Sequence, residues 1–343
     1  MESLHPILLQ ASLHETIWGG RRLERAGWKQ FPLGDTAIGE AWETEISTIA
    51  QNEPYVGKTL GTLVEELGPA LLGEQAVRIF GHRFPLLAKF IDANDKLSVQ
   101  VHPDDTYAAQ HEGGKFGKTE FWYILDAEPG ATIIHGFKAP TSRAEVQQAI
   151  EEVTLDKLLQ QVTVSAGDVI FVPAGTVHAI GSGVMLYELQ EYSDITYRMY
   201  DYGRHTAAGT PRQLHIEQSL AVSYYDKSSR VKAQPVPLAG GPGYEERCLV
   251  ACRYFVTREL QFKSGSRSGE TASSCIILSS LGAEIEVCYG PSLKYNQLLS
   301  RGQTLVLPAA LGKYRIEGEG VVALSYVPGP GDEAWQLWEA KNR

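Results

Sequence analysis

The chain has few cysteines, no long hydrophobic run and no excess of basic charge over its 343 residues. Because a membrane-spanning helix needs about 18 or more consecutive apolar residues, we expect none here. The opening residues Met1–Pro6 carry neither the basic start nor the apolar core of a secretory leader. We therefore expect a cytoplasmic protein. The net charge of −10 argues against a nucleic-acid-binding surface, because phosphate contacts need a basic face.

The few cysteines form no clear metal or disulfide pattern. Their number would allow pairing, but no secretory leader supports an oxidising compartment. The two that lie nearest in sequence lack the Cys-x-x-Cys spacing of a zinc site. We therefore expect free, mostly buried thiols at all four positions, which are Cys248, Cys252, Cys275 and Cys288.

Length and composition indicate an ordinary globular protein with room for two packed domains or one enlarged domain. Hydrophobic residues make up 43% of the chain and charged residues 21%, which are usual values for such proteins. Residues 233–243 are rich in proline and glycine and are typical of a linker. We predict a first domain over residues 1–232, with helical insertions near 59–80 and 141–159, and a second β domain over residues 244–343.

The stretch Leu97–Asp105 is the most informative part of the chain. Apolar and polar residues alternate in it, which predicts a β-strand with Ser98, Gln100 and His102 on one face. Pro103 cannot donate a hydrogen bond to a sheet and ends the strand. This strand face therefore presents a hydroxyl, an amide and an imidazole in a row.

A second stretch, Gly167–Ile180, combines an apolar strand with a sharp corner and a histidine. Five residues separate Gly167 from Pro173, and Gly175 and His178 follow. This is the second signature of the cupin jelly-roll barrels, which reads Gly-x5-Pro-x-Gly-x2-His. The chain is similar to that superfamily in this stretch.

The first cupin signature normally supplies His-x-His followed by Glu. Here Gln100 and His102 stand in the place of the two histidines, and Glu120 in the place of the acid. Glutamine at the first position departs from the general cupin pattern. Within one family, however, Gln-x-His is the expected form.

That family is the type I phosphomannose isomerases, which the chain resembles in several short segments in the same order. The segments cover roughly the first two thirds of the chain, and the last third matches no sharp motif. They are Ile17–Gly20, Lys89–Ala93, Leu97–Asp104, Gly117–Glu120, Val172–His178 and Ser193–Arg198. The resemblance implies a mainly β fold of two cupin-like jelly-roll barrels with short helical insertions, the first of which is catalytic.

The resemblance also implies one divalent metal, Zn²⁺, held in the first barrel by Gln100, His102, Glu120 and His178. Two of these ligands share a strand face, and neighbouring strands of a small barrel can point the others inward. Mixed imidazole and oxygen ligands are typical of catalytic zinc, although nickel or ferrous iron could also bind. The alternative is a polar barrel interior without metal. We expect another histidine, His135, to be structural.

The implied reaction is the interconversion of mannose 6-phosphate and fructose 6-phosphate through a cis-enediol or enediolate. A divalent cation can stabilise the developing charge, and a protein base must carry the proton between C1 and C2. Glu188 and Lys118 are both candidates for the base, with Glu188 favoured for the C–H proton and Lys118 for the substrate oxygens. Arg198 is expected at the phosphate or the enediolate, and Lys89 and Ser98 complete the predicted phosphate contacts.

The last third of the chain contains a partial repeat of the second signature. Gly302 and Pro308 repeat the spacing of Gly167 and Pro173, but Lys313 stands where His178 would be. This predicts a second, degenerate cupin-like barrel that cannot bind metal in the same way.

Two other functions remain open from the residues alone. A non-catalytic cupin that senses a sugar phosphate is one, although no helix-turn-helix or basic module accompanies the barrel. A cupin dioxygenase is the other, but such enzymes usually bind iron through more histidines, and Gln100 takes the place of one of them. The expected partner is a small sugar phosphate, with no nucleic acid, no membrane and no obligatory protein partner.

Overall fold

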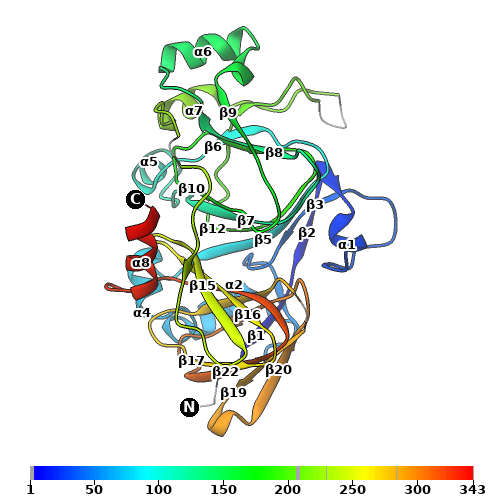
Figure 1. Ribbon diagram of the computed structural model, residues 1–343, viewed down its shortest axis with the longest axis vertical. Helices are drawn as coiled ribbons and strands as arrows, with labels where there is room; N and C mark the ends of the chain where they lie inside the picture. The colour runs from blue at the N-terminus through cyan, green and yellow to red at the C-terminus, as the bar shows by residue number, and fades with distance from the viewer. Residues whose placement is uncertain (1–3, 206–208, 229, 283, 343) are drawn as a thin grey trace.

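The computed structural model describes residues 4–205, 209–228, 230–282 and 284–342. Over these ranges the chain is mainly β, and its strands form four antiparallel sheets. The sheets are arranged as two pairs that follow one another along the long axis of the molecule (Figure 1). The predicted mainly β, cupin-like fold class is therefore confirmed.

The first pair joins a six-stranded sheet, in the order β10-β7-β12-β5-β3-β2, to a five-stranded sheet, in the order β13-β6-β11-β8-β9. Apolar side chains from both sheets, such as Trp122 and Ile180, meet between them in one buried cluster. The strands are β2 (Ser12–Gly20), β3 (Ile38–Trp42), β5 (Leu86–Ala93), β6 (Val99–Val101), β7 (Glu120–Ala127), β8 (Thr132–Phe137), β9 (Leu159–Thr163), β10 (Val169–Val172), β11 (His178–Ile180), β12 (Val184–Glu191) and β13 (Tyr197–Tyr200).

The second pair joins an eight-stranded sheet, in the order β14-β15-β16-β23-β18-β21-β1-β4, to a four-stranded sheet, in the order β17-β22-β19-β20. Its own apolar cluster fills the space between the two sheets. The strands are β1 (Ile7–Gln10), β4 (Ile49–Ala50), β14 (Val236–Pro237), β15 (Tyr244–Ala251), β16 (Val256–Phe262), β17 (Ser266–Glu270), β18 (Ile276–Ser280), β19 (Ile285–Tyr289), β20 (Tyr295–Leu299), β21 (Thr304–Leu307), β22 (Lys313–Gly318) and β23 (Gly320–Tyr326).

Apart from β13 in the first pair and β1 and β4 in the second, the second pair repeats the connectivity of the first. Read from β21, the larger sheet runs β21-β18-β23-β16-β15-β14, which matches β10-β7-β12-β5-β3-β2 in chain order. The smaller sheets match in the same way, β17-β22-β19-β20 with β6-β11-β8-β9. This supports the repeat that the Gly302 to Pro308 spacing predicts. The division at residues 232 and 244 stays a prediction, and β1 and β4 extend the second, not the first, of the two larger sheets.

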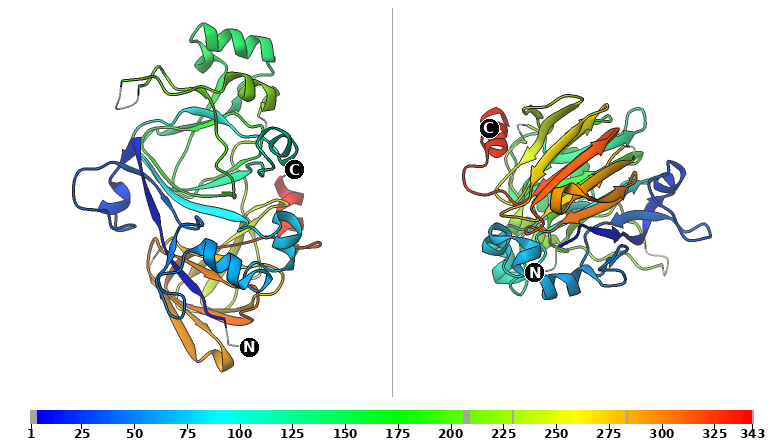
Figure 2. Two further views of the ribbon diagram at one scale, coloured as in Figure 1. Left: turned by 180° about the vertical axis from the view of Figure 1, so that it is seen from behind. Right: turned by 90° about the horizontal axis from the view of Figure 1, so that it is seen from below.

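Short helices cover the outer faces of the sheets and the junction between the pairs (Figures 1 and 2). The side chains of α5, α6 and α7 pack on the outer face of the five-stranded sheet. The predicted helical insertion near 59–80 consists of three helices, and the backbone N–H of Ala309 donates to the carbonyl of Leu71 in one of them. The helices are α1 (Arg22–Arg25), α2 (Leu60–Leu67), α3 (Pro69–Leu72), α4 (Glu74–Phe80), α5 (Asp105–His111), α6 (Arg143–Glu151), α7 (Ile216–Val222) and α8 (Glu333–Asn342), with 3₁₀ turns η1 (Leu155–Lys157) and η2 (Pro291–Leu293).

Strands β5 and β12 lie at the centre of the six-stranded sheet and are buried along their whole length. One face of that sheet packs against the five-stranded sheet, and the other packs toward the eight-stranded sheet through rings such as Tyr187 and Phe255. A strand covered on both faces should be almost entirely apolar. Charged residues in these two strands, such as Lys89 and Glu188, are therefore exceptions that call for a partner or a function.

Two local features depend on packing between segments. Strand β8 pairs with β11 and β9 and not with β7, the strand that precedes it in the chain. The helix near residue 141 begins after Ser142, whose hydroxyl accepts the Glu145 N–H at 3.3 Å, and it ends at Glu151 rather than near Leu159. In both places the type of element follows from the local residues, but packing decides its partner or its end.

Candidate metal centre and active site

A cavity of about 360 Å³ opens between the six-stranded and five-stranded sheets of the first pair. Most of the predicted site residues line it, from six different strands and the loop that leads into β7. Those residues are Lys89, Gln100, Lys118, Glu120, His178, Glu188 and Arg198. His102 and Ser98 lie just behind this lining, each 1% exposed.

Backbone pairing explains why residues far apart in the sequence meet here. His178 opens β11 directly opposite Gln100 in β6. Glu120 opens β7 and is paired with Gln190 of β12 on one side. His102 follows β6 at the point where Pro103 ends the strand. Three short strand ends thus bring the four predicted ligands to one part of the cavity.

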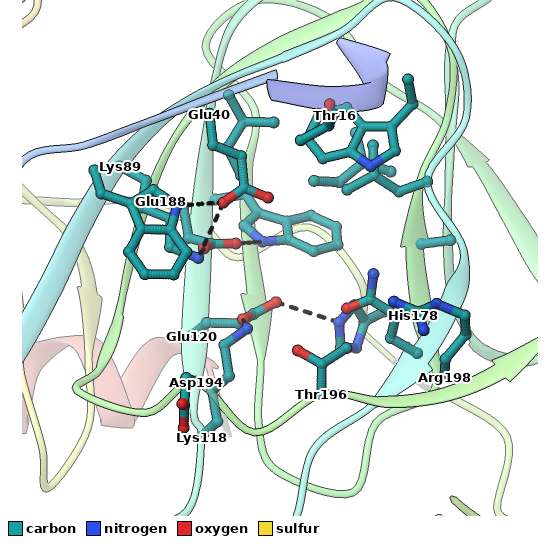
Figure 3. A pocket seen from close by; sticks show the side chains of 18 of the residues that line it. Thr16, Glu40, Lys89, Lys118, Glu120, His178, Glu188, Asp194, Thr196 and Arg198 are labelled. Atoms are coloured by element: carbon teal, nitrogen blue, oxygen red, sulfur yellow. Dashed lines mark hydrogen bonds and ion pairs between the residues drawn. The ribbon is translucent and has the colours of Figure 1, made fainter. Parts of the chain in front are cut away.

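The two imidazoles and the carboxylate of this group are in near contact. Nε2 of His178 lies 3.3 Å from Oε1 of Glu120 (Figure 3), and Nε2 of His102 lies 3.6 Å from Oε2 of the same residue. One donor atom from each of the three residues lies within 4.8 Å of the others, and all three residues are buried. This is the compact arrangement that a single cation needs.

Both histidines are set up to offer a lone pair. Nδ1 of His178 donates to the carbonyl of Thr176 at 2.8 Å, which leaves Nε2 unprotonated and directed at Glu120. Burial lowers the pKa of His178 to about 4. Burial, with the nearby charge of Lys118, also lowers the pKa of His102 well below its ordinary value. Both rings are therefore neutral near pH 7, which is the form that binds metal.

The carboxylate completes a donor set that fits a divalent cation. Burial raises the pKa of Glu120 to about 7, and the Nζ atom of Lys118 lies 3.0 Å from its Oε2 and 3.1 Å from Nε2 of His102. An ammonium group thus lies beside two of the atoms that a metal would use. The amide nitrogen of Gln100 donates to Ser98 Oγ at 3.1 Å, so its oxygen is the atom free to act as a ligand.

A second charged cluster in the cavity surrounds Glu188. Its Oε1 is 3.1 Å from Nζ of Lys89, and its Oε2 accepts a hydrogen bond from Nε1 of Trp122 at 3.0 Å. Glu40 lies 3.6 Å from the same Lys89 nitrogen, and the ring of Trp42 lies below it. Figure 3 shows this cluster facing the metal-ligand group across the open part of the pocket.

The charges in this cluster fix its ionisation. Burial alone would raise the pKa of Glu188, but Lys89 and Lys118 outweigh burial and lower it. Burial alone would lower the pKa of Lys89, but Glu188, Glu40 and Glu120 outweigh it and raise the pKa. At neutral pH the cavity therefore holds the ionised carboxylate of Glu188 beside the protonated amine of Lys89, away from bulk water.

Arg198 marks the other side of the pocket, away from Lys89 and Glu188 (Figure 3). Its Nε lies 3.3 Å from Oγ of Ser98, and its Nη1 donates to the carbonyl of Gln213 at 2.9 Å. Ser98 thus holds both Arg198 and Gln100 from behind and does not itself line the cavity.

Some lining residues were not predicted from the sequence. Glu40 and Trp42 lie in a strand that we had assigned no task, and Arg212 lies in a loop without a motif. Their only sequence signal is a charge or a ring in an otherwise ordinary segment. Structure alone brings them to the site.

The remaining predictions concern residues outside the pocket. His135 is structural, as expected, because one ring nitrogen contacts Ser228 Oγ at 2.8 Å and the other contacts the Phe171 carbonyl at 2.9 Å. The four cysteines are free, and three of them are buried, as expected. In the described parts of the chain, no helix is long and apolar enough to cross a membrane.

Comparison with known proteins agrees with this geometry. Residues 7–131 match the type I phosphomannose isomerase catalytic domain. The chain is 37% identical to the mannose-6-phosphate isomerase of Streptococcus mutans, over 94% of this chain and 98% of that protein. It is 35% identical to the mannose-6-phosphate isomerase ManA of Bacillus subtilis, over 94% and 99%.

A solved structure extends the likeness to three dimensions. The crystal structure of the mannose 6-phosphate isomerase from Bacillus subtilis superimposes with a TM-score of 0.83 and 31% identity. The match covers 94% of this chain and 99% of that one, so it includes both pairs of sheets. With sequence and fold in agreement over nearly its full length, the chain belongs to the type I phosphomannose isomerase family.

Proposed function

We propose that the chain interconverts mannose 6-phosphate and fructose 6-phosphate, using one divalent cation, Zn²⁺, bound by Gln100, His102, Glu120 and His178. The observation that carries this proposal is the buried His102–Glu120–His178 group, with both imidazoles neutral, beside a cavity that also holds the ionised Glu188. A bound cation would act as a Lewis acid toward the carbonyl and hydroxyl oxygens at C1 and C2 of the open-chain sugar.

Glu188 is the proposed base. It is buried and its pKa is lowered, so it is a carboxylate at neutral pH. Taking the C2 proton of the aldose gives an enediolate, and returning that proton to C1, while the hydroxyl proton passes from O2 to O1, gives the ketose. One group therefore suffices for both proton transfers at carbon. The hydrogen bond from Trp122 and the ion pair with Lys89 hold the carboxylate in place.

The other cationic side chains have separate tasks in this proposal. Lys118 contacts the substrate oxygens, because its ammonium group lies beside the metal ligands and lines the open cavity. Arg198 binds the phosphate group through its planar fork of donors. Lys89 as a phosphate ligand stays a prediction, since its nitrogen is engaged with two carboxylates.

The direct test adds mannose 6-phosphate to the purified protein with and without a chelator. We expect fructose 6-phosphate to form only when a divalent metal is present, and zinc to restore activity after chelation. Binding without turnover at any metal loading would instead favour the non-catalytic sensor. A cytoplasmic location and independence of protein partners stay predictions.

The roles of the two candidate bases are separated by Glu188→Gln and Lys118→Met. Glu188→Gln should lower kcat by about 10²- to 10⁴-fold with metal content unchanged. Glu43→Gln is a matched control, because Glu43 is equally buried and lies 2.6 Å from Lys29, yet it does not line the cavity. A Glu188→Gln enzyme with normal kcat would move the base role to another residue.

A further inference from the structure

A second arginine, Arg212, lines the same cavity as Arg198. It lies in the loop between β13 and α7, in a segment that no sequence motif singles out. Its neighbour along the chain, Gln213, accepts the hydrogen bond from Nη1 of Arg198 at 2.9 Å. The loop that carries Arg212 is therefore tied directly to the other arginine.

Asp201 holds Arg212 in position. Nη1 of Arg212 lies 3.3 Å from each carboxylate oxygen of Asp201, which is 4% exposed. Arg204 binds the same carboxylate through Nε, at 3.1 Å, and through Nη2. One buried acid thus anchors two arginines, but only Arg212 of these two lines the cavity.

The positive charge on this side of the pocket exceeds the negative charge. Arg204 and Arg212 share the carboxylate of Asp201, and Arg204 reaches a second acid, Asp95, at 3.7 Å. Arg198 contacts neither acid, and burial and then the nearby charge of Arg212 lower its pKa. Two guanidinium groups that face one cavity repel each other unless an anion lies between them.

Both arginines also keep donors for such an anion. Within the described ranges, Nη2 of Arg198 has no hydrogen-bond acceptor, and the same holds for Nε and Nη2 of Arg212. The side chain of Arg212 is 20% exposed, so these groups are held by the fold but reachable from the cavity.

We propose that Arg212 is a second phosphate-binding arginine, which forms with Arg198 a clamp for the phosphate ester of the substrate. A phosphate monoester carries nearly two negative charges near pH 7 and three acceptor oxygens, which matches two guanidinium forks. Asp201 is a positioning residue, because it fixes the side chain of Arg212 without lining the cavity. The inference rests on the proposed isomerase function and adds a residue that selects phosphorylated sugars over free ones.

Arg204 offers a matched control for the test. It shares the carboxylate partner of Arg212, so a purely structural role through Asp201 would make Arg204→Gln and Arg212→Gln behave alike. The experiment measures kcat and KM for mannose 6-phosphate, together with inhibition by inorganic phosphate, in the metal-loaded full chain. Arg212→Lys is added because it keeps the charge but loses the paired donors.

For Arg212→Gln we expect KM and the inhibition constant of phosphate to rise by about 10- to 100-fold, with kcat within about threefold. Arg212→Lys should lie in between, and Arg204→Gln should change neither constant by more than about threefold. Equal effects of Arg204→Gln and Arg212→Gln, or a loss in kcat with KM and phosphate inhibition unchanged, would overturn the role of Arg212.

Failure of the isomerase function and failure of the phosphate clamp give different results. If the metal-loaded wild-type chain converts no mannose 6-phosphate, the isomerase function fails. Calorimetric titration with inorganic phosphate still decides the clamp in that case. Weaker phosphate binding in Arg212→Gln than in Arg204→Gln supports it, and equal binding contradicts it. Unchanged metal content and circular dichroism in the Gln variants exclude misfolding as the cause.

Discussion

The Nζ atom of Lys118 lies 3.1 Å from Nε2 of His102, and so a lysine cation stands beside a proposed metal ligand. Since ammonium carries three protons and no lone pair, the imidazole must accept. The same nitrogen lies 3.0 Å from Glu120. A cation bound by His102 and Glu120 would therefore meet a neighbouring positive charge.

This relationship gives a prediction for Lys118→Met. Removing the ammonium group removes repulsion at short range, so the dissociation constant for zinc should fall by about tenfold. At the same time kcat should fall by about 10²-fold, because the contact with substrate oxygens is lost. Zinc titration and steady-state kinetics on the same preparation check both. Weaker zinc binding in the variant would mean that Lys118 supports the ligands instead.

The pair formed by Lys89 and Glu188 predicts a change in pH dependence. Lys89 lowers the pKa of Glu188, so Lys89→Met should raise it. Because the base acts as a carboxylate, the acid limb of the kcat/KM profile should move to higher pH by about one unit or more. Lys29→Met is the control, since Lys29 pairs with Glu43 outside the cavity. Identical acid limbs in wild type and Lys89→Met would contradict the role of Glu188.

Metal content should depend on Glu120 but not on an equally buried acid elsewhere. Glu120→Gln removes the charge that faces both histidines, so zinc content after dialysis should drop to near zero and activity with it. Glu43→Gln should lose stability, because Lys29 stays behind as a buried charge, yet keep its zinc. Metal analysis of the two folded variants distinguishes them. Full zinc occupancy in Glu120→Gln would remove Glu120 from the ligand set.

Glu191 makes stability depend on pH. Burial, and then Asp105, raises its pKa from 4.5 to about 8. Between these values the folded state keeps a proton that the unfolded state has lost, so this residue makes stability fall as pH rises. Glu191→Gln should therefore gain stability over wild type as the pH goes from 5 to 8, by at least ~1 kcal/mol at pH 8.

Urea unfolding at several pH values measures this difference. Glu65→Gln serves as control, because Glu65 is exposed. A stability gain that is the same at pH 5 and pH 8 would show that Glu191 is ionised in the folded state at both.

The sequence was sufficient for the parts of the site that depend on local pattern. Alternation in Leu97–Asp105 placed Gln100 and His102 on one face, and the spacing from Gly167 predicted the corner before His178. The partial repeat at Gly302 predicted a second unit, and the matching sheet orders support it. These features are short-range, so a single segment carries the whole signal.

Other parts depend on contacts between distant segments and could not be read from the sequence. Glu40 and Trp42 reach Lys89 because β3 pairs with β5. Arg212 reaches the cavity because Asp201 holds it. Helix ends and strand partners also depend on contacts between distant segments. An example is the pairing of β8 with β11 rather than with β7. Tertiary packing decides these features.

The most direct measurement of the central claim is anomalous X-ray scattering at the zinc absorption edge, from crystals of the purified chain grown with zinc. We expect one strong peak per chain, about 2.0–2.2 Å from Nε2 of His102, from Nε2 of His178 and from oxygens of Glu120 and Gln100. A pocket without a peak while zinc is in excess, or a peak bound by other residues, would contradict the account.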